Sequence, residues 1–112
     1  MVYAAAAAAL AVLEVRVHLD LPPDLIPGDY VLVTIDLGAL PAETVTTAPL
    51  DLAAFGDTWL EERRTPVLAV PSFIVPETLN YLINPQHPDA ADARIVAERS
   101  FDFDRRLWLP LR

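Results

Sequence analysis

Hydrophobic and polar residues along the chain follow two periods, and the longer period predicts two helices. Six consecutive alanines lead into an apolar run that predicts a helix over residues 4–19, because alanine and leucine favour the helical state. Its buried stripe is expected to consist of Ala6, Leu10, Leu13 and Val17. A second helix is expected over residues 51–64, with one apolar face formed by Leu52, Phe55, Trp59 and Leu60 and a solvated end over residues 61–64.

The shorter period predicts strands. Residues 30–37 alternate in a way that fits a strand with one face well buried, whereas residues 38–50, between two prolines, lack a sustained period. Short apolar strands are expected over residues 67–70, 73–75 and 79–83, a brief helix over 89–94, and a strand or extended segment over 95–103. This order predicts an α+β fold with a small mixed sheet and flanking helices. Because there is no repeat or linker, residues 1–112 are expected to form a single domain.

The segment from Val67 to Pro88 combines buried strands with a polar, proline-rich loop. Its prolines remove backbone donors and fix the chain in turns, so that it cannot be an ordinary helix. A rigid polar loop beside buried strands is a common place for a binding or catalytic site.

Composition and charge exclude several classes of function. Sixteen acidic residues against eight basic ones give a net charge of −8, which makes nucleic acid and anionic membranes poor partners. The absence of cysteine excludes disulfides and thiolate metal sites, and two isolated histidines do not suggest zinc, so metal-free chemistry is expected. The apolar N-terminal run is too short to span a bilayer and has no basic residue before it, which favours a cytoplasmic protein.

Seven polar residues remain as candidates for a site: Tyr3, Glu14, His18, Ser72, Asn80, Asn84 and His87. Each also has a structural interpretation. A glutamate at a helix margin is usually solvated, and a serine after proline is usually a structural hydroxyl. The asparagines and His87 would ordinarily hydrogen-bond within their own turns. Composition alone does not choose between these interpretations.

Four blocks of sequence, in order, carry a resemblance to a known family. They are Leu-Glu-Val-Arg-Val-His-Leu at 13–19, Gly-Asp-Thr-Trp-Leu at 56–60, the run beginning Leu-Ala-Val-Pro-Ser-Phe-Ile-Val-Pro-Glu-Thr at 68–88, and Phe-Asp-Phe-Asp-Arg-Arg-Leu at 101–107. Together they resemble the RES domain, the toxin half of bacterial RES–Xre toxin–antitoxin systems. The resemblance implies a fold similar to ADP-ribosyltransferases, cleavage of the nicotinamide–ribose bond of NAD, which is a substrate rather than a cofactor, and an Xre-type antitoxin partner.

The resemblance also assigns residues. The family takes its name from an Arg, a Glu and a Ser, and Glu14 and Ser72 match the last two. Tyr3 is placed like a tyrosine that the family carries in the strand ahead of this helix. The Arg has no match: it is expected upstream of Tyr3, and Arg16 cannot replace it. This implies a partial RES domain, lacking its N-terminal segment through truncation or gene decay, with an edge strand left unpaired and poor solubility.

Two hypotheses follow from the resemblance. The first is an NAD-degrading toxin in which Glu14 stabilises positive charge on the ribose, Tyr3 stacks on a ring of NAD, and Ser72 hydrogen-bonds the substrate. Transfer of ADP-ribose goes to water or phosphate, with weak or no activity expected because the Arg is missing. The alternative is a catalytically dead module that binds an Xre-type antitoxin. The oligomeric state, including a homo-oligomer, stays open.

Overall fold

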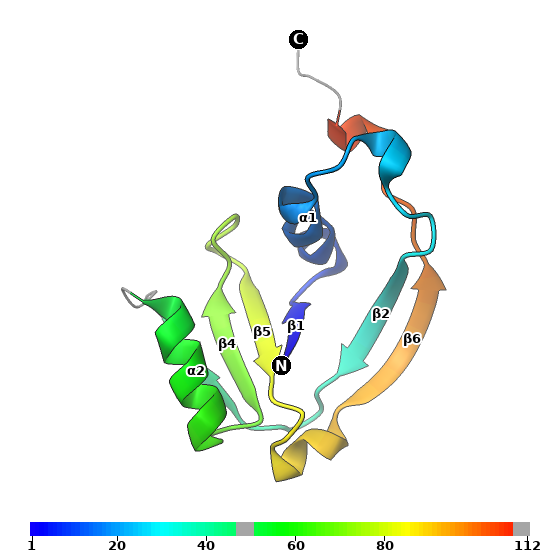
Figure 1. Ribbon diagram of the computed structural model, residues 1–112. Coiled ribbons are helices and arrows are strands. Elements are labelled where there is room, and N and C mark those ends of the chain that lie inside the picture. The colour runs from blue at the N-terminus through cyan, green and yellow to red at the C-terminus, as the bar shows by residue number, and fades with distance from the viewer. Residues whose placement is uncertain (47–50, 109–112) are drawn as a thin grey trace.

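The computed structural model describes residues 1–46 and 51–108, which form two α-helices, six strands and three short 3-10 helices (Figure 1). The helices are α1 (Ala8–His18) and α2 (Leu52–Glu62), and the 3-10 helices are Pro23–Leu25, Pro88–Asp92 and Arg105–Trp108. The strands are β1 (Val2–Ala5), β2 (Val31–Asp36), β3 (Ala42–Thr44), β4 (Val67–Pro71), β5 (Leu79–Ile83) and β6 (Arg94–Ser100). The expected α+β class, with a small mixed sheet and flanking helices, is confirmed.

Four of the strands form one sheet in the order β1-β5-β4-β3. Strand β5 is antiparallel to both β1 and β4, while β3 runs parallel to β4. Helix α2 packs on this sheet, and its fully buried Trp59 joins Leu68, Val70 and Leu82 in the core (Figure 1). Leu52, Phe55 and Leu60 pack around this cluster, so the apolar face expected for the second helix is confirmed.

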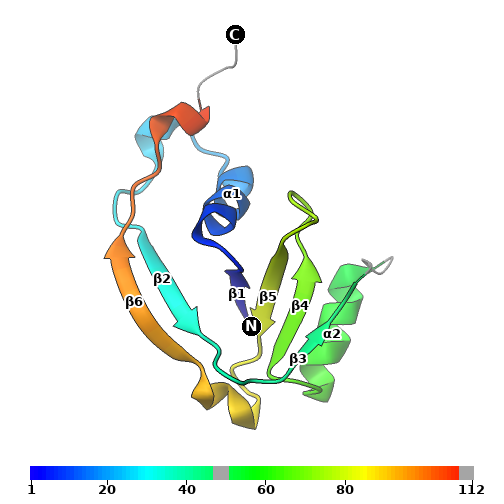
Figure 2. The same cartoon turned by 180° about the vertical axis from the view of Figure 1, so that it is seen from behind.

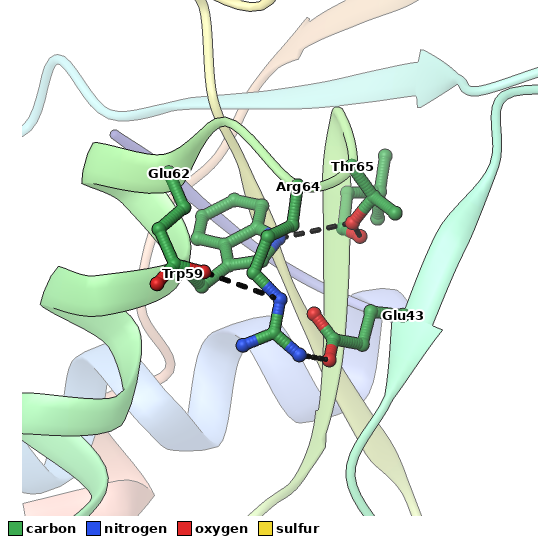
Figure 3. A network of polar contacts seen from close by, with 6 residues as sticks. Glu43, Trp59, Glu62, Arg64 and Thr65 are labelled. Carbon is green, nitrogen blue, oxygen red and sulfur yellow. Dashed lines mark hydrogen bonds and ion pairs between the residues drawn. The ribbon is translucent and has the colours of Figure 1, made fainter.

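Both ends of α2 are fixed by polar contacts. Asp51 caps the start, accepting a hydrogen bond of 3.0 Å from the backbone N–H of Ala54. Beyond the other end, Trp59 Nε1 donates to Thr65 Oγ1 at 2.9 Å, as Figure 3 shows. In the same view Arg64 reaches across to Glu43 on β3, which ties the turn after α2 to the edge of the sheet (Figure 3).

The first helix is shorter and less buried than the sequence predicts. It begins at Ala8 instead of residue 4, because β1 pairs with β5 up to Ala5 and this pairing overrides the helix propensity of alanine. The expected stripe is wrong except at Leu10: Ala6 precedes the helix, Leu13 is exposed, and Val17 is 55% exposed. A helix that is apolar on all sides has no single face that its sequence directs inward.

The strand expected over residues 30–37 is confirmed as β2, but neither of its faces is well buried. Strand β2 pairs with β6, whose residues are all exposed, and a register shift between Thr34 and Ile35 interrupts the alternation. The two strands form a separate two-stranded sheet that stands away from the four-stranded one (Figures 1 and 2). Val31 and Val33 are therefore exposed.

Two shorter segments also differ from expectation. Residues 38–50, for which the sequence predicts no regular element, contain β3, and residues 47–50 lie outside the described part of the chain. The strand expected over 73–75 is a bend, because Ser72 Oγ accepts hydrogen bonds from the backbone N–H groups of Ile74 and Val75 and turns the chain. The brief helix expected over 89–94 is the 3-10 helix Pro88–Asp92, and β6 confirms the strand expected after it.

Candidate functional site

A hydrogen-bonded cluster joins α1 to the end of β4 and the start of β5. Glu14, in the second half of α1, accepts two hydrogen bonds at the same oxygen, Oε1. Ser72 Oγ donates one at 2.7 Å and Asn80 Nδ2 donates the other at 2.9 Å. Residues separated by 58 and 66 positions in sequence are thus held in direct contact by the fold.

Ser72 is oriented by its own loop. Its side chain follows the last residue of β4, and the residue is only 1% exposed. Because Oγ accepts from the N–H groups of Ile74 and Val75, each at 3.1 Å, the hydroxyl proton is directed to Glu14. A hydroxyl with two amide donors and one carboxylate acceptor has little freedom to rotate.

Asn80, one of the polar candidates, belongs to this cluster, so its interpretation as a turn-forming residue is wrong. It lies in β5, paired with Ala5 of β1 and Val70 of β4, and this register places its amide beside Glu14. Its Oδ1 is buried, with no hydrogen-bond partner among the described residues.

The cluster keeps Glu14 ionised. The hydrogen bond from Asn80, followed by the one from Ser72, lowers the pKa of Glu14 below its ordinary value, with a smaller contribution from the charge of His18. Partial burial acts in the opposite direction but does not prevail. Within residues 1–46 and 51–108 no protein donor bonds Oε2, so one oxygen of a fixed carboxylate remains available to a ligand.

A small pocket opens beside Glu14. It has a volume of about 120 Å³, and its lining consists of Tyr3, Ala4, Ala5, Ala11, Glu14 and Asn80. Tyr3 lies on β1 opposite Leu82 and is 74% exposed, so its ring is accessible at the rim. The structure therefore brings together all three residues that the resemblance selects, with Tyr3 and Glu14 sharing one pocket and Ser72 behind Glu14.

The other polar candidates lie elsewhere or have structural partners. Asn84 is buried, donates to the carbonyl of Leu60 and accepts from the N–H of Gln86, which stabilises the chain after β5. His87 Nδ1 accepts from the N–H of Asp89 and caps the following 3-10 helix. The turn-forming interpretation of these two residues is confirmed.

Arg16 points away from the cluster. Its Nε donates to the carbonyl of Leu107 at 3.2 Å, and its guanidinium group lies 4.2 Å from the centre of the Trp108 ring. It therefore ties α1 to the C-terminal 3-10 helix. No basic residue is among those of the described chain that line the pocket.

Two classes of feature are absent from the part of the chain that the structure describes. Residues 1–46 and 51–108 contain no group of three or more His, Asp or Glu side chains placed to hold a metal ion. Neither of the two described helices is long and apolar enough to cross a membrane.

Comparison with known proteins places these features in a family. Residues 1–104 match the RES domain. The chain is 39% identical over 120 residues to "Toxin Res" of Pseudomonas putida, covering 96% of this chain and 79% of that protein. It is 37% identical over 121 residues to "Prs ADP-ribosylating toxin" of a Sphingobium species, covering 96% and 74%. A second "Toxin Res", from Photorhabdus laumondii, is 33% identical over 118 residues. The chain belongs to the RES domain family.

Proposed function

We propose that this chain is part of a toxin that cleaves the bond between nicotinamide and ribose in NAD and transfers the ADP-ribosyl group to an acceptor. The observation that carries the proposal is the carboxylate of Glu14, held by Ser72 and Asn80 with one oxygen free beside a pocket rimmed by Tyr3. Relatives named as toxins, one of them as an ADP-ribosylating toxin, support a toxin role.

The charge of Glu14 suits this reaction. When the C1′–N bond breaks, its electron pair leaves with neutral nicotinamide and positive charge develops on the ribose. A carboxylate that is already ionised and fixed stabilises that charge without reorganising during the step. Acceptor oxygen then bonds to C1′ and releases its proton to solvent, which gives ADP-ribose and nicotinamide when the acceptor is water.

Tyr3 and Ser72 would contribute in different ways. The exposed ring of Tyr3 offers a stacking surface for the nicotinamide or adenine ring of NAD. Ser72 is 1% exposed and bonded on all sides, so we assign it to positioning Glu14 instead of contacting the substrate. This changes the role that the resemblance suggested for its hydroxyl.

The acceptor belongs to one of two classes, either a small molecule, which is water or phosphate, or a protein. Water or phosphate would make the chain an NAD-depleting toxin. The Sphingobium relative is named "Prs ADP-ribosylating toxin", which instead favours a protein acceptor, Prs, for that relative. NAD labelled in its ADP-ribosyl part distinguishes the acceptors, because the label ends on free ADP-ribose with water, on ADP-ribose 1″-phosphate with phosphate, and on added Prs protein with a protein acceptor.

Release of nicotinamide from NAD tests the proposal. We expect slow release from the wild-type chain, since the described pocket has no basic side chain to hold the diphosphate of NAD. Glu14→Gln should abolish the release. Glu61→Gln, the same change on the exposed side of α2, is the matched control and should leave the rate unchanged.

Two results would contradict the proposal. One is equal nicotinamide release from the wild-type and Glu14→Gln chains. The other is no release together with no NAD binding, measured by titration at millimolar NAD. Binding of an Xre-type antitoxin that persists without NAD loss and is unaffected by Glu14→Gln would favour the alternative of a catalytically inactive binding module.

A further inference from the structure

The pocket beside Glu14 is small and has apolar walls. Its volume is about 120 Å³, and three of its lining residues are alanines, namely Ala4 and Ala5 of β1 and Ala11 of α1. An apolar cavity of about 150 Å³ holds one benzene ring. A pocket of this size that is open at its rim therefore admits one six-membered aromatic ring, whereas the two fused rings of adenine exceed it.

The lining of the pocket carries negative charge and no positive charge. Among the described residues that line it, Glu14 is the only ionised one, and its Oε2 accepts no hydrogen bond from them. The neutral side-chain donors of this lining are the hydroxyl of Tyr3 and the amide of Asn80, and one N–H of that amide already bonds Glu14. The pocket therefore favours an occupant with hydrogen-bond donors and opposes an occupant with its own negative charge.

The repulsion of an anion is large because the pocket is small. An anionic group inside it lies within about 6–8 Å of the Glu14 carboxylate, and at an effective dielectric constant of about 20 two like charges at that separation change affinity by about 30- to 100-fold. Water at the open rim screens part of this effect, so that a difference of about tenfold or more remains. A single neutral hydrogen bond from Tyr3 offsets only part of it.

We propose that this pocket selects the carboxamide form of the pyridine ring of NAD and rejects the carboxylate form, with Glu14 as the residue that discriminates between them. The inference rests on the proposed function, in which Glu14 lies beside the ribose that bears this ring. Nicotinamide is neutral and has an N–H2 donor group, whereas nicotinate at neutral pH has one negative charge and no donor. The chain thus uses NAD and leaves nicotinic acid adenine dinucleotide intact.

Binding of the two free pyridines to the intact chain tests the proposal without requiring any reaction. At neutral pH we expect nicotinamide to shift the NMR signals of the methyl groups of Ala4, Ala5 and Ala11, and nicotinate to bind about tenfold more weakly or worse. Glu14→Gln removes the charge and should bring the two affinities to within about threefold of each other. Glu61→Gln, on the exposed side of α2, is the matched control and should keep the full difference.

A second pair of variants tests the fit of the ring. Ala11→Leu fills the pocket from α1 and should weaken nicotinamide binding about tenfold or more. Ala9→Leu is the matched control, because Ala9 is exposed on the same helix and does not line the pocket. Leucine suits a helix nearly as well as alanine does, so both variants should fold.

Four results would overturn the proposal: no binding of either pyridine up to its solubility limit, equal affinities in the wild-type chain, an affinity difference that Glu14→Gln leaves unchanged, or equal weakening by the two leucine variants. Because each ratio of affinities is measured within one variant, partial unfolding of that variant does not alter it.

Failure of the proposed function is a separate result. A chain that discriminates between the pyridines but releases no nicotinamide from NAD keeps the pocket and loses the reaction. A chain that cleaves NAD and nicotinic acid adenine dinucleotide at equal rates keeps the reaction and loses the specificity.

Discussion

Removal of the hydrogen bond between Ser72 and Glu14 is expected to lower the free energy of unfolding and to abolish the energetic coupling between these two side chains. Ser72→Ala deletes one charge-assisted bond of 2.7 Å to a carboxylate. It also removes the acceptor for the N–H groups of Ile74 and Val75 in a partly buried loop. The variant thus affects both the position of Glu14 and the bend that ends β4.

The magnitude follows from these three bonds. A hydrogen bond to a charged group contributes about 1.5–3 kcal/mol, and each amide that loses its partner costs about 1 kcal/mol when water replaces it incompletely. Since the loop is partly exposed, we expect the free energy of unfolding to fall by about 2–4 kcal/mol. Ser100→Ala, at the exposed end of β6, should change it by less than about 0.5 kcal/mol.

A double-mutant cycle isolates the contact with Glu14. Urea unfolding of the wild-type, Ser72→Ala, Glu14→Gln and double-variant chains gives the coupling free energy, which we expect to be about 1–2 kcal/mol at neutral pH. A coupling below about 0.5 kcal/mol would show that Ser72 stabilises its loop but does not hold the carboxylate. The positioning role assigned to Ser72 would then be wrong.

Three further predictions concern the charge of Glu14 and the end of α2. The folded pKa of Glu14 lies below its ordinary value of 4.5, so the stability that its charge contributes is present above that value and is lost as pH falls through the lowered folded pKa. Glu14→Gln should remove this part of the acid dependence of the free energy of unfolding, which urea unfolding at several pH values measures. Asn80→Asp should raise the pKa of Glu14 in an NMR titration, since a second carboxylate replaces the strongest donor, and an unchanged pKa would contradict the assigned cause. Arg63 ends α2 with a φ of 52°, so Arg63→Gly should stabilise the chain by about 0.5–1 kcal/mol, whereas Arg64→Gly, which loses the contact with Glu43, should destabilise it.

Sequence reasoning succeeded where one local signal acted alone. The apolar face of α2 follows from spacing, and its core partners on β4 and β5 follow from short runs of buried residues. It failed at residues 4–7, where pairing with β5 outweighs alanine propensity, and at residues 73–75, where the hydroxyl of Ser72 turns an apolar run away from a strand. The first failure depends on a strand that is distant in sequence, and the second on a local side-chain hydrogen bond that competes with the strand conformation.

At the candidate site, too, the sequence predicts some members correctly and misinterprets others. The resemblance selected Tyr3, Glu14 and Ser72, and the fold brings them to one place. Asn80 is among the polar candidates, but its interpretation as a turn-forming residue is wrong, because its contact with Glu14 depends on the register of β5 between β1 and β4, which sequence periodicity does not fix. The exposed face of β2 was missed for a related reason: alternation indicates that a face is apolar but does not indicate what covers it.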